Sequence, residues 1–211
     1  MTLTPNTAIV QTSALNFSYP DKLLFSNFAA GFSAGITLIR GGDGTGKSTL
    51  LRLLAGSLSA HSGQLLLNGV DLKLQRQAYK AKVFWVDPRE NAFDQITALA
   101  FFQLQRSVYP NFDDAVLADM TFGLGLHEHL CKQLFMLSTG SKRKVFLAAA
   151  FAANTPVTLL DEPFAALDAA SIGFLTTQLK RVQNSLNRAW VLADYSAPEG
   201  LRLAQVIDLG D

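Results

Sequence analysis

A glycine-rich loop between a strand pattern and a helical pattern constrains this chain more than any other feature. Residues 41–49 read Gly-Gly-Asp-Gly-Thr-Gly-Lys-Ser-Thr, which satisfies the spacing G-x-x-x-x-G-K-[ST]. The apolar run Ile36–Ile39 precedes the loop, and leucines at helical spacing follow it as far as Gly56. Glycines let backbone N–H groups converge on an anion, and the helix that follows adds the positive end of its dipole. The segment therefore predicts a phosphate-binding loop in an α/β domain.

The loop assigns roles to particular side chains. Lys47 would place a positive charge against the β- and γ-phosphates of ATP, and Ser48 would ligate Mg²⁺. An incidental glycine-rich turn with a lysine would not explain the strand, loop and helix together. The residues expected to bind nucleotide here are Gly41, Gly42, Asp43, Gly44, Thr45, Gly46, Lys47, Ser48 and Thr49.

Two adjacent carboxylates follow a second apolar run. Val157–Leu160 predicts a buried strand, and Asp161 and Glu162 come directly after it. Parallel strands bring their carboxyl ends to one edge of a sheet, which would place both acids beside the phosphate loop. Asp161 suits the metal site, and Glu162 suits a catalytic base or an orienter of the attacking water. A solvated helix cap is the alternative interpretation of the two acids.

The rest of the chain alternates between strand and helix patterns, which favours a mostly parallel sheet. Residues 9–32 predict two or three antiparallel strands, and residues 98–133 predict an inserted set of helices. Further strands are expected at 64–67, 82–86, 189–193 and 205–209, and further helices at about 141–153 and 169–182.

We therefore expect an α/β fold: a P-loop NTPase core with a mostly parallel sheet, N-terminal antiparallel β strands and an inserted α-helical subdomain. The single domain would span residues 1–211, with its core in 1–87 and 137–211 and the helical subdomain at about 88–136.

Composition narrows the compartment and the partners. With 49% hydrophobic and 17% charged residues, the 211-residue chain is long enough for one packed domain. A net charge of +1 gives no general attraction to nucleic acid, so no nucleic-acid partner is expected. The single cysteine, Cys131, excludes an internal disulfide and suits a reducing compartment. Met1–Val10 lacks a secretory-signal layout and the longest apolar run, Val145–Ala153, is too short to cross a bilayer, which favours the cytoplasm.

A third motif, Leu137-Ser138-Thr139-Gly140-Ser141, precedes the strand at 157–160. With it, nearly the whole chain resembles the ATPase subunits of ABC transporters, of the single-cassette bacterial type. The resemblance implies that Tyr19 stacks on adenine, that Ser138–Ser141 is the signature motif and that residues 164–168 contact a second cassette. In this family the signature of one subunit closes over the nucleotide of the other. The implied partners are thus a second ABC cassette, in a homo- or heterodimer, and a membrane-spanning permease subunit that would hold the chain on the inner face of the cell membrane.

The signature residues are suited to binding a phosphate, and two other features of the chain leave alternatives open. Ser138 offers a hydroxyl and Gly140 an unobstructed N–H to a γ-phosphate, at the positive end of a helix beginning near Ser141. The basic residues 142–144 in the first turn of that helix would be explained by a nearby anionic ligand or partner, or by a solvated basic face. For Tyr19, a core aromatic on a strand is the alternative to adenine stacking.

The chain departs from the family pattern at four positions. Thr139 and Ser141 stand where glycine and glutamine are usual. The glutamine that the family carries after the strand at 82–86 is missing, because Val86 or Asp87 occupies the aligned position. The histidine that contacts the γ-phosphate has Tyr195 as its nearest match. A phenol donates one hydrogen bond but is neutral at pH 7, so slow hydrolysis is a consequence to test.

The leading interpretation is an ATP-binding and ATP-hydrolysing subunit of an ABC transporter, with Glu162 and Tyr195 as catalytic residues. An ATP-dependent clamp or switch with little turnover is the alternative from another class, since Tyr195 replaces histidine. A soluble cassette acting on nucleic acid or ribosomes has only the basic residues 142–144 in its favour. A metal site at His127, His129 and Cys131 lacks a fourth ligand, and the aromatic residues Trp85, Phe93, Phe101 and Phe102 are expected in the hinge and core of the helical insert.

Overall fold

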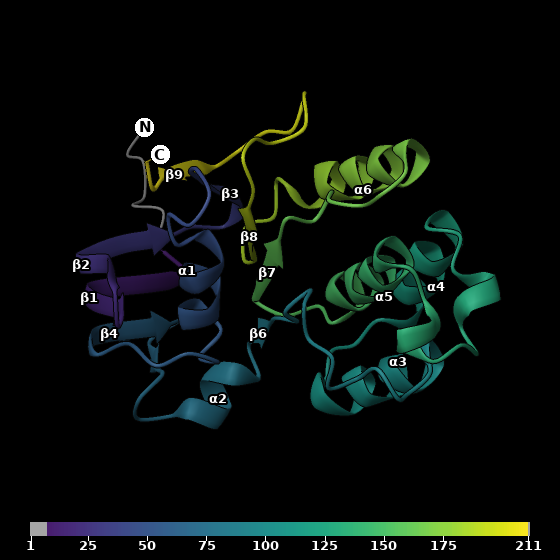
Figure 1. Ribbon diagram of the computed structural model, residues 1–211, viewed down its shortest axis with the longest axis horizontal. Coiled ribbons are helices and arrows are strands. Elements are labelled where there is room, and N and C mark those ends of the chain that lie inside the picture. Colours follow the sequence, from purple (N-terminus) through teal and green to yellow (C-terminus); the bar gives the residue numbers. More distant parts are fainter. Residues whose placement is uncertain (1–7, 211) are drawn as a thin grey trace.

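The computed structural model describes residues 8–210, which form two sheets and a group of helices (Figure 1). Residues 1–7, most of the stretch in which no secretory signal is expected, lie outside the described range, as does residue 211. Figure 1 shows α1 (Lys47–Leu54) between the antiparallel sheet on one side and the central strands on the other. No helix within the described range is long and apolar enough to cross a membrane.

The antiparallel sheet has the strand order β2-β1-β4-β5. Its strands are β1 (Val10–Tyr19), β2 (Lys22–Phe32), β4 (Ser62–Leu67) and β5 (Val70–Asp71). Tyr19 pairs with Lys22 across the two-residue turn Pro20-Asp21, so both side chains stand at the same end of the hairpin. A short turn of this kind makes the two flanking strands neighbours by necessity. The turn therefore presents an aromatic ring and an ammonium group side by side.

The central sheet is parallel, with the order β6-β7-β8-β3-β9. Its strands are β3 (Gly35–Arg40), β6 (Val83–Phe84), β7 (Val157–Asp161), β8 (Ala189–Ala193) and β9 (Gln205–Asp208). All residues of β7 and β8 are buried, which explains why both strands read as continuous rather than alternating apolar runs. The carboxyl ends of β3, β7 and β8 lie together at one edge, where ligands bind in open α/β sheets.

The helices after β6 are α3 (Ala98–Val108), α4 (Asp114–Gly123), two short 3₁₀ turns at His127–His129 and Leu134–Met136, α5 (Thr139–Ala152) and α6 (Ala169–Val182); α2 (Arg76–Lys80) precedes β6. Thr97 caps α3 by accepting a hydrogen bond from the Ala100 N–H, and Asp113 caps α4 in the same way. In Figure 1, α3, α4 and α5 lie on the side of the central sheet away from α1.

Two hydrophobic clusters sandwich the central sheet. Along β8, Trp190 and Leu192 point into one cluster and Val191 and Ala193 into the other, as the alternation of a strand requires. One cluster joins the sheet to α1 and the antiparallel strands, and the other joins it to α3, α5 and α6.

The expected fold class is confirmed, and two expected elements need correction. The strand expected at 82–86 is only Val83–Phe84, because β6 is an edge strand that pairs with two residues of β7 before the chain turns at Asp87-Pro88. The helical stretch expected at 98–133 is present as α3, α4 and the 3₁₀ turn His127–His129, and the second 3₁₀ turn follows it. The helix expected from Ser141 begins at Thr139, because the Ser138 side chain accepts a hydrogen bond from the Ser141 N–H.

The aromatic residues of the insert form part of the core, as expected. Phe101 and Phe102 are buried, and Phe93 packs edge-on against Phe101 with ring centroids 5.1 Å apart. Helix α5 packs against both α3 and α4, so one apolar cluster continues from the helices to the sheet. The division of the chain at about residues 88 and 136 stays a prediction.

Candidate nucleotide-binding site

The glycine-rich loop joins β3 to α1 and owes its path to left-handed glycines. Gly44 has φ 72° and Gly46 has φ 106°, conformations that side chains with a Cβ rarely adopt. A Cβ on Gly46 would lie only 3.1 Å from Cζ of Phe25, so glycine is also needed for space. Because Gly46 is the N-cap of α1, the turn delivers the first residues of that helix to the loop.

Lys47 is buried inside this loop. Its side chain is 6% exposed, and Nζ donates hydrogen bonds to the carbonyl oxygens of Gly41 at 2.7 Å and Gly42 at 2.8 Å. The ammonium is therefore held at the concave side of the loop, where the N–H groups of a phosphate loop converge.

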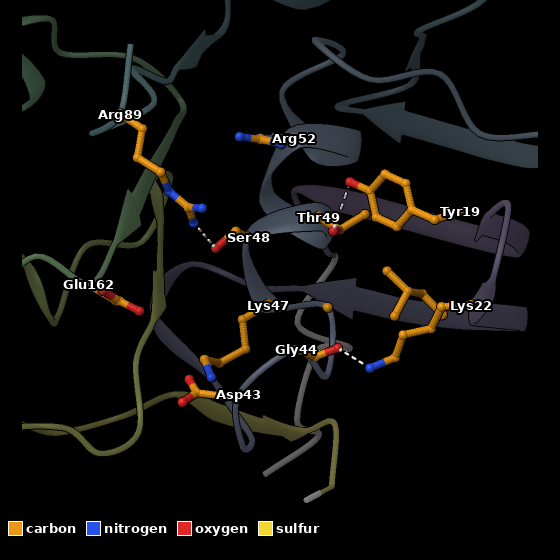
Figure 2. A pocket seen from close by; sticks show the side chains of 12 residues that line it. Tyr19, Lys22, Asp43, Gly44, Lys47, Ser48, Thr49, Arg52, Arg89 and Glu162 are labelled. Atoms are coloured by element: carbon orange, nitrogen blue, oxygen red, sulfur yellow. Dashed lines mark hydrogen bonds between the residues drawn. The ribbon is translucent and has the colours of Figure 1, made fainter.

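A cleft of about 470 Å³ opens beside the loop (Figure 2). Its walls come from the β1–β2 hairpin, the loop and the first two turns of α1, the segment after β6, and the end of β7. Predicted residues that line it are Tyr19, Asp43, Gly44, Gly46, Lys47, Ser48, Thr49 and Glu162. The structure thus brings together side chains that lie more than a hundred residues apart in the sequence.

Tyr19 stands at the hairpin end of the cleft. It is 40% exposed, packs edge-on against Phe17 with centroids 5.1 Å apart, and its hydroxyl lies 3.4 Å from Oγ1 of Thr49. The alternative of a core aromatic is wrong, because Tyr19, the last residue of β1, is exposed rather than buried among the core side chains. A fixed, half-open ring suits stacking on a base.

Ser48 and Asp161 form a candidate metal site. Asp161 is 8% exposed, and burial raises the pKa of its carboxyl, while a hydrogen bond from the Ser48 hydroxyl acts in the opposite direction. Oδ1 of Asp161 is buried with no hydrogen-bond partner in residues 8–210. An unpartnered carboxylate oxygen next to a hydroxyl fits Mg²⁺, which prefers oxygen ligands and keeps several of its waters.

Glu162 is turned into the cleft by a left-handed backbone. Its φ is 44°, and its N–H donates to the Ala193 carbonyl at 2.8 Å. The half-buried guanidinium of Arg143 donates to the backbone carbonyls of Asp161 and Glu162. A non-glycine residue in this conformation costs roughly 1 kcal/mol or more, and such strain persists where neighbouring contacts enforce it.

The signature residues lie outside the cleft. Ser138 is exposed at the N-terminus of α5, and Gly140 packs against the loop that follows Glu162. A Cβ on Gly140 would lie 2.3 Å from the Ala166 carbonyl oxygen, which requires glycine for packing as well as for any exposed N–H. Ser138 and Gly140 therefore do not line this chain's own nucleotide cleft, and their contact with a nucleotide held by a second cassette stays a prediction.

The basic residues at the start of α5 have partners within the chain. Lys142 pairs with Asp94 and donates to the Glu90 carbonyl at 2.8 Å, and Lys144 pairs with Asp168 at 2.6 Å. The interpretation as a solvated basic face is wrong for Lys142 and Lys144, because both side chains are largely buried against these carboxylates. The loops before α3 and after β7 supply this negative charge, and an anionic ligand or partner at the start of α5 stays a prediction.

Tyr195 contacts the phosphate loop but is not part of the cleft wall. It is 54% exposed, its hydroxyl donates to the Asp43 carboxylate, and its ring centroid lies 4.4 Å from Nζ of Lys47. The hydrogen bond to Asp43 raises the pKa of the Tyr195 phenol. The assignment of Tyr195 to the γ-phosphate stays a prediction. Its present contacts are with Asp43 and Lys47 of the phosphate loop.

Three cations in the cleft wall were missed from the sequence: Lys22, Arg52 and Arg89. Nζ of Lys22 donates to the Gly44 carbonyl at 2.8 Å. Arg52 donates to the carboxylate of Asp87, which with Val86 is one of the two positions that could align with the missing glutamine. Arg89 follows β6 as Glu162 follows β7, and that shared position at the carboxyl edge of the sheet was the available signal.

Comparison with known proteins decides the family. The ABC transporter family profile matches residues 30–165. The chain belongs to this family. The expected ABC cassette, its ATP ligand and its class as a transporter ATPase are thereby confirmed.

Curated relatives of this cassette serve different transport systems. It is 31% identical over 172 residues, covering 81% of this chain and 82% of the relative, to the cytochrome c biogenesis ATP-binding export protein CcmA of Pseudomonas fluorescens. It is 29% identical to the glycine betaine uptake system ATP-binding protein YehX of Escherichia coli, covering 93% of this chain and 68% of the relative. These relatives agree with the expected membrane transport partner.

Solved structures show the same fold at lower identity. An ABC transporter ATP-binding protein from Pyrococcus furiosus matches 95% of this cassette and 96% of its own chain, with a TM-score of 0.75 and 21% identity. An ATP-binding cassette solved as a dimer with ADP and Pi matches 89% of this chain and 88% of its own, with a TM-score of 0.74 and 18% identity.

Among residues 8–210, no group of three or more His, Cys, Asp or Glu side chains is arranged to hold a metal ion.

Proposed function

We propose that this cassette binds MgATP in the cleft beside α1 and hydrolyses it to drive a membrane-spanning permease. The observation that carries the proposal is the convergence of Lys47, Ser48 and Glu162 on one cleft with Tyr19 at its other end. Asp161 lies directly behind Ser48, whose hydroxyl donates to its carboxylate. Lys47, Ser48 and Asp161 would contact phosphate or metal, as such groups do in P-loop ATPases, and Glu162 would act as the base.

Binding would divide between the two ends of the cleft. Tyr19 offers a ring to adenine, and base–aromatic stacking contributes about 1–3 kcal/mol. Lys47 and the loop N–H groups hold the β- and γ-phosphates, and the oxygens of Ser48 and Asp161 hold Mg²⁺. Magnesium, when bound, neutralises charge on the phosphates as the terminal bond breaks.

Glu162 would orient the attacking water and accept its proton as the water oxygen forms a bond to the γ-phosphorus and the bond to the ADP oxygen breaks. Its left-handed backbone and the Arg143 contacts hold the carboxylate in the cleft. Ser138 and Gly140 would contact the γ-phosphate held by a second cassette, and each cassette would complete the other's site. In this arrangement the chain works on the cytoplasmic face of the membrane that holds its permease.

The test compares two variants with matched controls. Lys47→Ala should lose most ATP affinity, whereas Lys73→Ala, an exposed lysine, should not. Glu162→Gln should keep ATP affinity and abolish phosphate release, with an ATP-bound dimer accumulating on size exclusion; Glu199→Gln, at an exposed site, should behave as wild type. Unchanged binding of a fluorescent ATP analogue by Lys47→Ala would refute the site.

A clamp with little turnover is the second candidate. It is favoured by Tyr195, because the hydroxyl at the expected histidine position already donates to Asp43. The phosphate-release rate of the wild-type cassette, alone and as an ATP-induced dimer, separates the two: a clamp closes on ATP but releases no phosphate in either state.

A further inference from the structure

Arg89 lies in the nucleotide cleft on a loop whose geometry is fixed from α1. The carboxylate of Asp87 accepts hydrogen bonds from Nε and Nη2 of Arg52, at 3.0 and 2.5 Å. The other oxygen of the same carboxylate accepts the backbone N–H of Arg89 at 3.0 Å. Asp87 thus ties the start of this loop to the second turn of α1, and the side chain of Arg89 leaves the loop toward the cleft.

The guanidinium of Arg89 points at the phosphate end of the cleft. Figure 2 shows it directed at Ser48, with Lys47 and Glu162 nearby. Its Nη2 lies 3.5 Å from Oγ of Ser48, the outer limit of a hydrogen bond, and Arg89 forms no ion pair in residues 8–210. A guanidinium carries five N–H donors, so most of its capacity is free for a ligand.

The charges around Ser48 indicate what that ligand is. Asp161 and Glu162 place two carboxyl groups on this side of the cleft, and the charge of Arg89 counteracts the rise that burial causes in the pKa of Asp161. A bound triphosphate would add more negative charge at the same place. Lys47 provides one cation from inside the loop, and Arg89 provides a second from across Ser48.

We propose that Arg89 binds the terminal phosphate of this chain's own nucleotide, a proposal that rests on the cleft being the ATP site. The planar fork of a guanidinium matches two phosphate oxygens, and charge-assisted bonds of this kind are stronger than neutral ones. Arg89 acts from the segment in which the family's glutamine is missing, and it brings a full charge where an amide would bring none.

The proposal predicts discrimination between tri- and diphosphate. Contacts with adenine and with the inner phosphates are common to ATP and ADP, whereas Arg89 would add affinity only when a third phosphate is present. One charge-assisted hydrogen bond at an exposed position corresponds to roughly a five- to twentyfold preference.

The experiment measures Kd by calorimetry for ADP and for the non-hydrolysable triphosphate adenylyl imidodiphosphate, both with Mg²⁺. Arg89→Ala should lower the triphosphate-to-diphosphate preference about five- to twentyfold, mainly through weaker triphosphate binding. Arg89→Lys should keep an intermediate preference, since an ammonium retains the charge but not the fork. Arg106→Ala, which removes an exposed arginine of α3, is the matched control and should keep the wild-type preference.

The outcomes are distinct. An unchanged ratio in Arg89→Ala, or an equal loss for both nucleotides, would overturn the contact while leaving the nucleotide site intact. If Arg89→Ala does not fold, Arg89→Gln is compared with Arg89→Lys, and equal ratios in that pair would overturn it as well. A wild-type chain that binds neither nucleotide would remove the proposed function and this inference together, so the two failures are distinguishable.

Discussion

Gly140→Ala is expected to destabilise the cassette, although alanine is the better helix former. The new Cβ would lie 2.3 Å from the Ala166 carbonyl oxygen, whereas ordinary contacts begin at 3.4 Å. The loop after β7 would therefore have to move by about 1 Å, as the difference between these two distances shows. That loop is held by the left-handed φ of 60° at Ala166 and by the hydrogen bond from the Ala165 N–H to the Glu162 carbonyl, at 3.1 Å.

Overpacking of this kind costs roughly 1–3 kcal/mol. In a chain of this size each kcal/mol shifts Tm by about 2–4 °C, so Gly140→Ala should melt roughly 2–12 °C lower. Gly173→Ala is the matched control: Gly173 is exposed in the middle of α6, and an added Cβ meets nothing within 4 Å. There, alanine should stabilise the fold by roughly 0.5–1 kcal/mol and raise Tm by about 1–4 °C.

Calorimetry and urea unfolding without nucleotide measure both variants. Opposite signs at the two glycines support the packing argument, whereas a Tm for Gly140→Ala equal to or above wild type refutes it. Because the displaced loop carries Glu162, phosphate release by Gly140→Ala should also fall, while Gly173→Ala should keep the wild-type rate.

Two further predictions concern Tyr195 and Asp168. If hydrolysis is limited at position 195, Tyr195→His should raise steady-state phosphate release by up to about tenfold, which corresponds to roughly 1.4 kcal/mol of transition-state stabilisation. Tyr195→Phe keeps the ring beside Lys47 and should not raise the rate. Equal rates in the two variants would show that Tyr195 does not limit hydrolysis. The Lys144 ammonium, together with the Ser171 N–H and hydroxyl, holds the pKa of Asp168 below its ordinary value of 3.8. Because the pKa of Asp168 is lower in the folded state, its carboxylate contributes fully to the free energy of unfolding above about pH 4, and this contribution is lost as the pH falls through the folded value. Wild type should therefore have a higher urea midpoint than Asp168→Asn at pH 6 and lose that advantage toward pH 2. A constant difference over this range would contradict the pairing.

Interactions between near neighbours in the chain were predictable. The strand, loop and helix at residues 36–54 follow from glycine conformation and apolar spacing, both of which act over a few residues. The two acids at the end of β7 lie beside the phosphate loop as expected, because strand ends converge in a parallel sheet whatever the details of packing. The boundaries of β6 and α5 were less predictable, since an edge pairing and a single side-chain cap decide them.

Contacts between distant segments were not predictable. The sequence left two interpretations open for the basic residues of α5, a solvated face or a nearby anion, and could not indicate that Lys142 and Lys144 pair with carboxylates 48 and 24 residues away. Nothing near Tyr195 in the chain indicates Asp43, which is 152 positions distant. In the sequence, nothing distinguishes Arg89 from the other arginines. In the structure, the hydrogen bonds of Asp87 to Arg52 and to the Arg89 N–H set the direction of its loop.

The amino-acid sequence by itself determined the phosphate loop, the carboxylates beside it and the family of this cassette. Each of these depends on a short motif, and the backbone conformation of a short motif is set by residues only a few positions apart. Only the tertiary structure decided which charges are already paired and which remain available to a nucleotide. The strength of an ion pair depends on the distance in space between the two charges. In a parallel sheet with helices on both faces, the order of the strands sets that distance, and the separation of the residues along the chain does not.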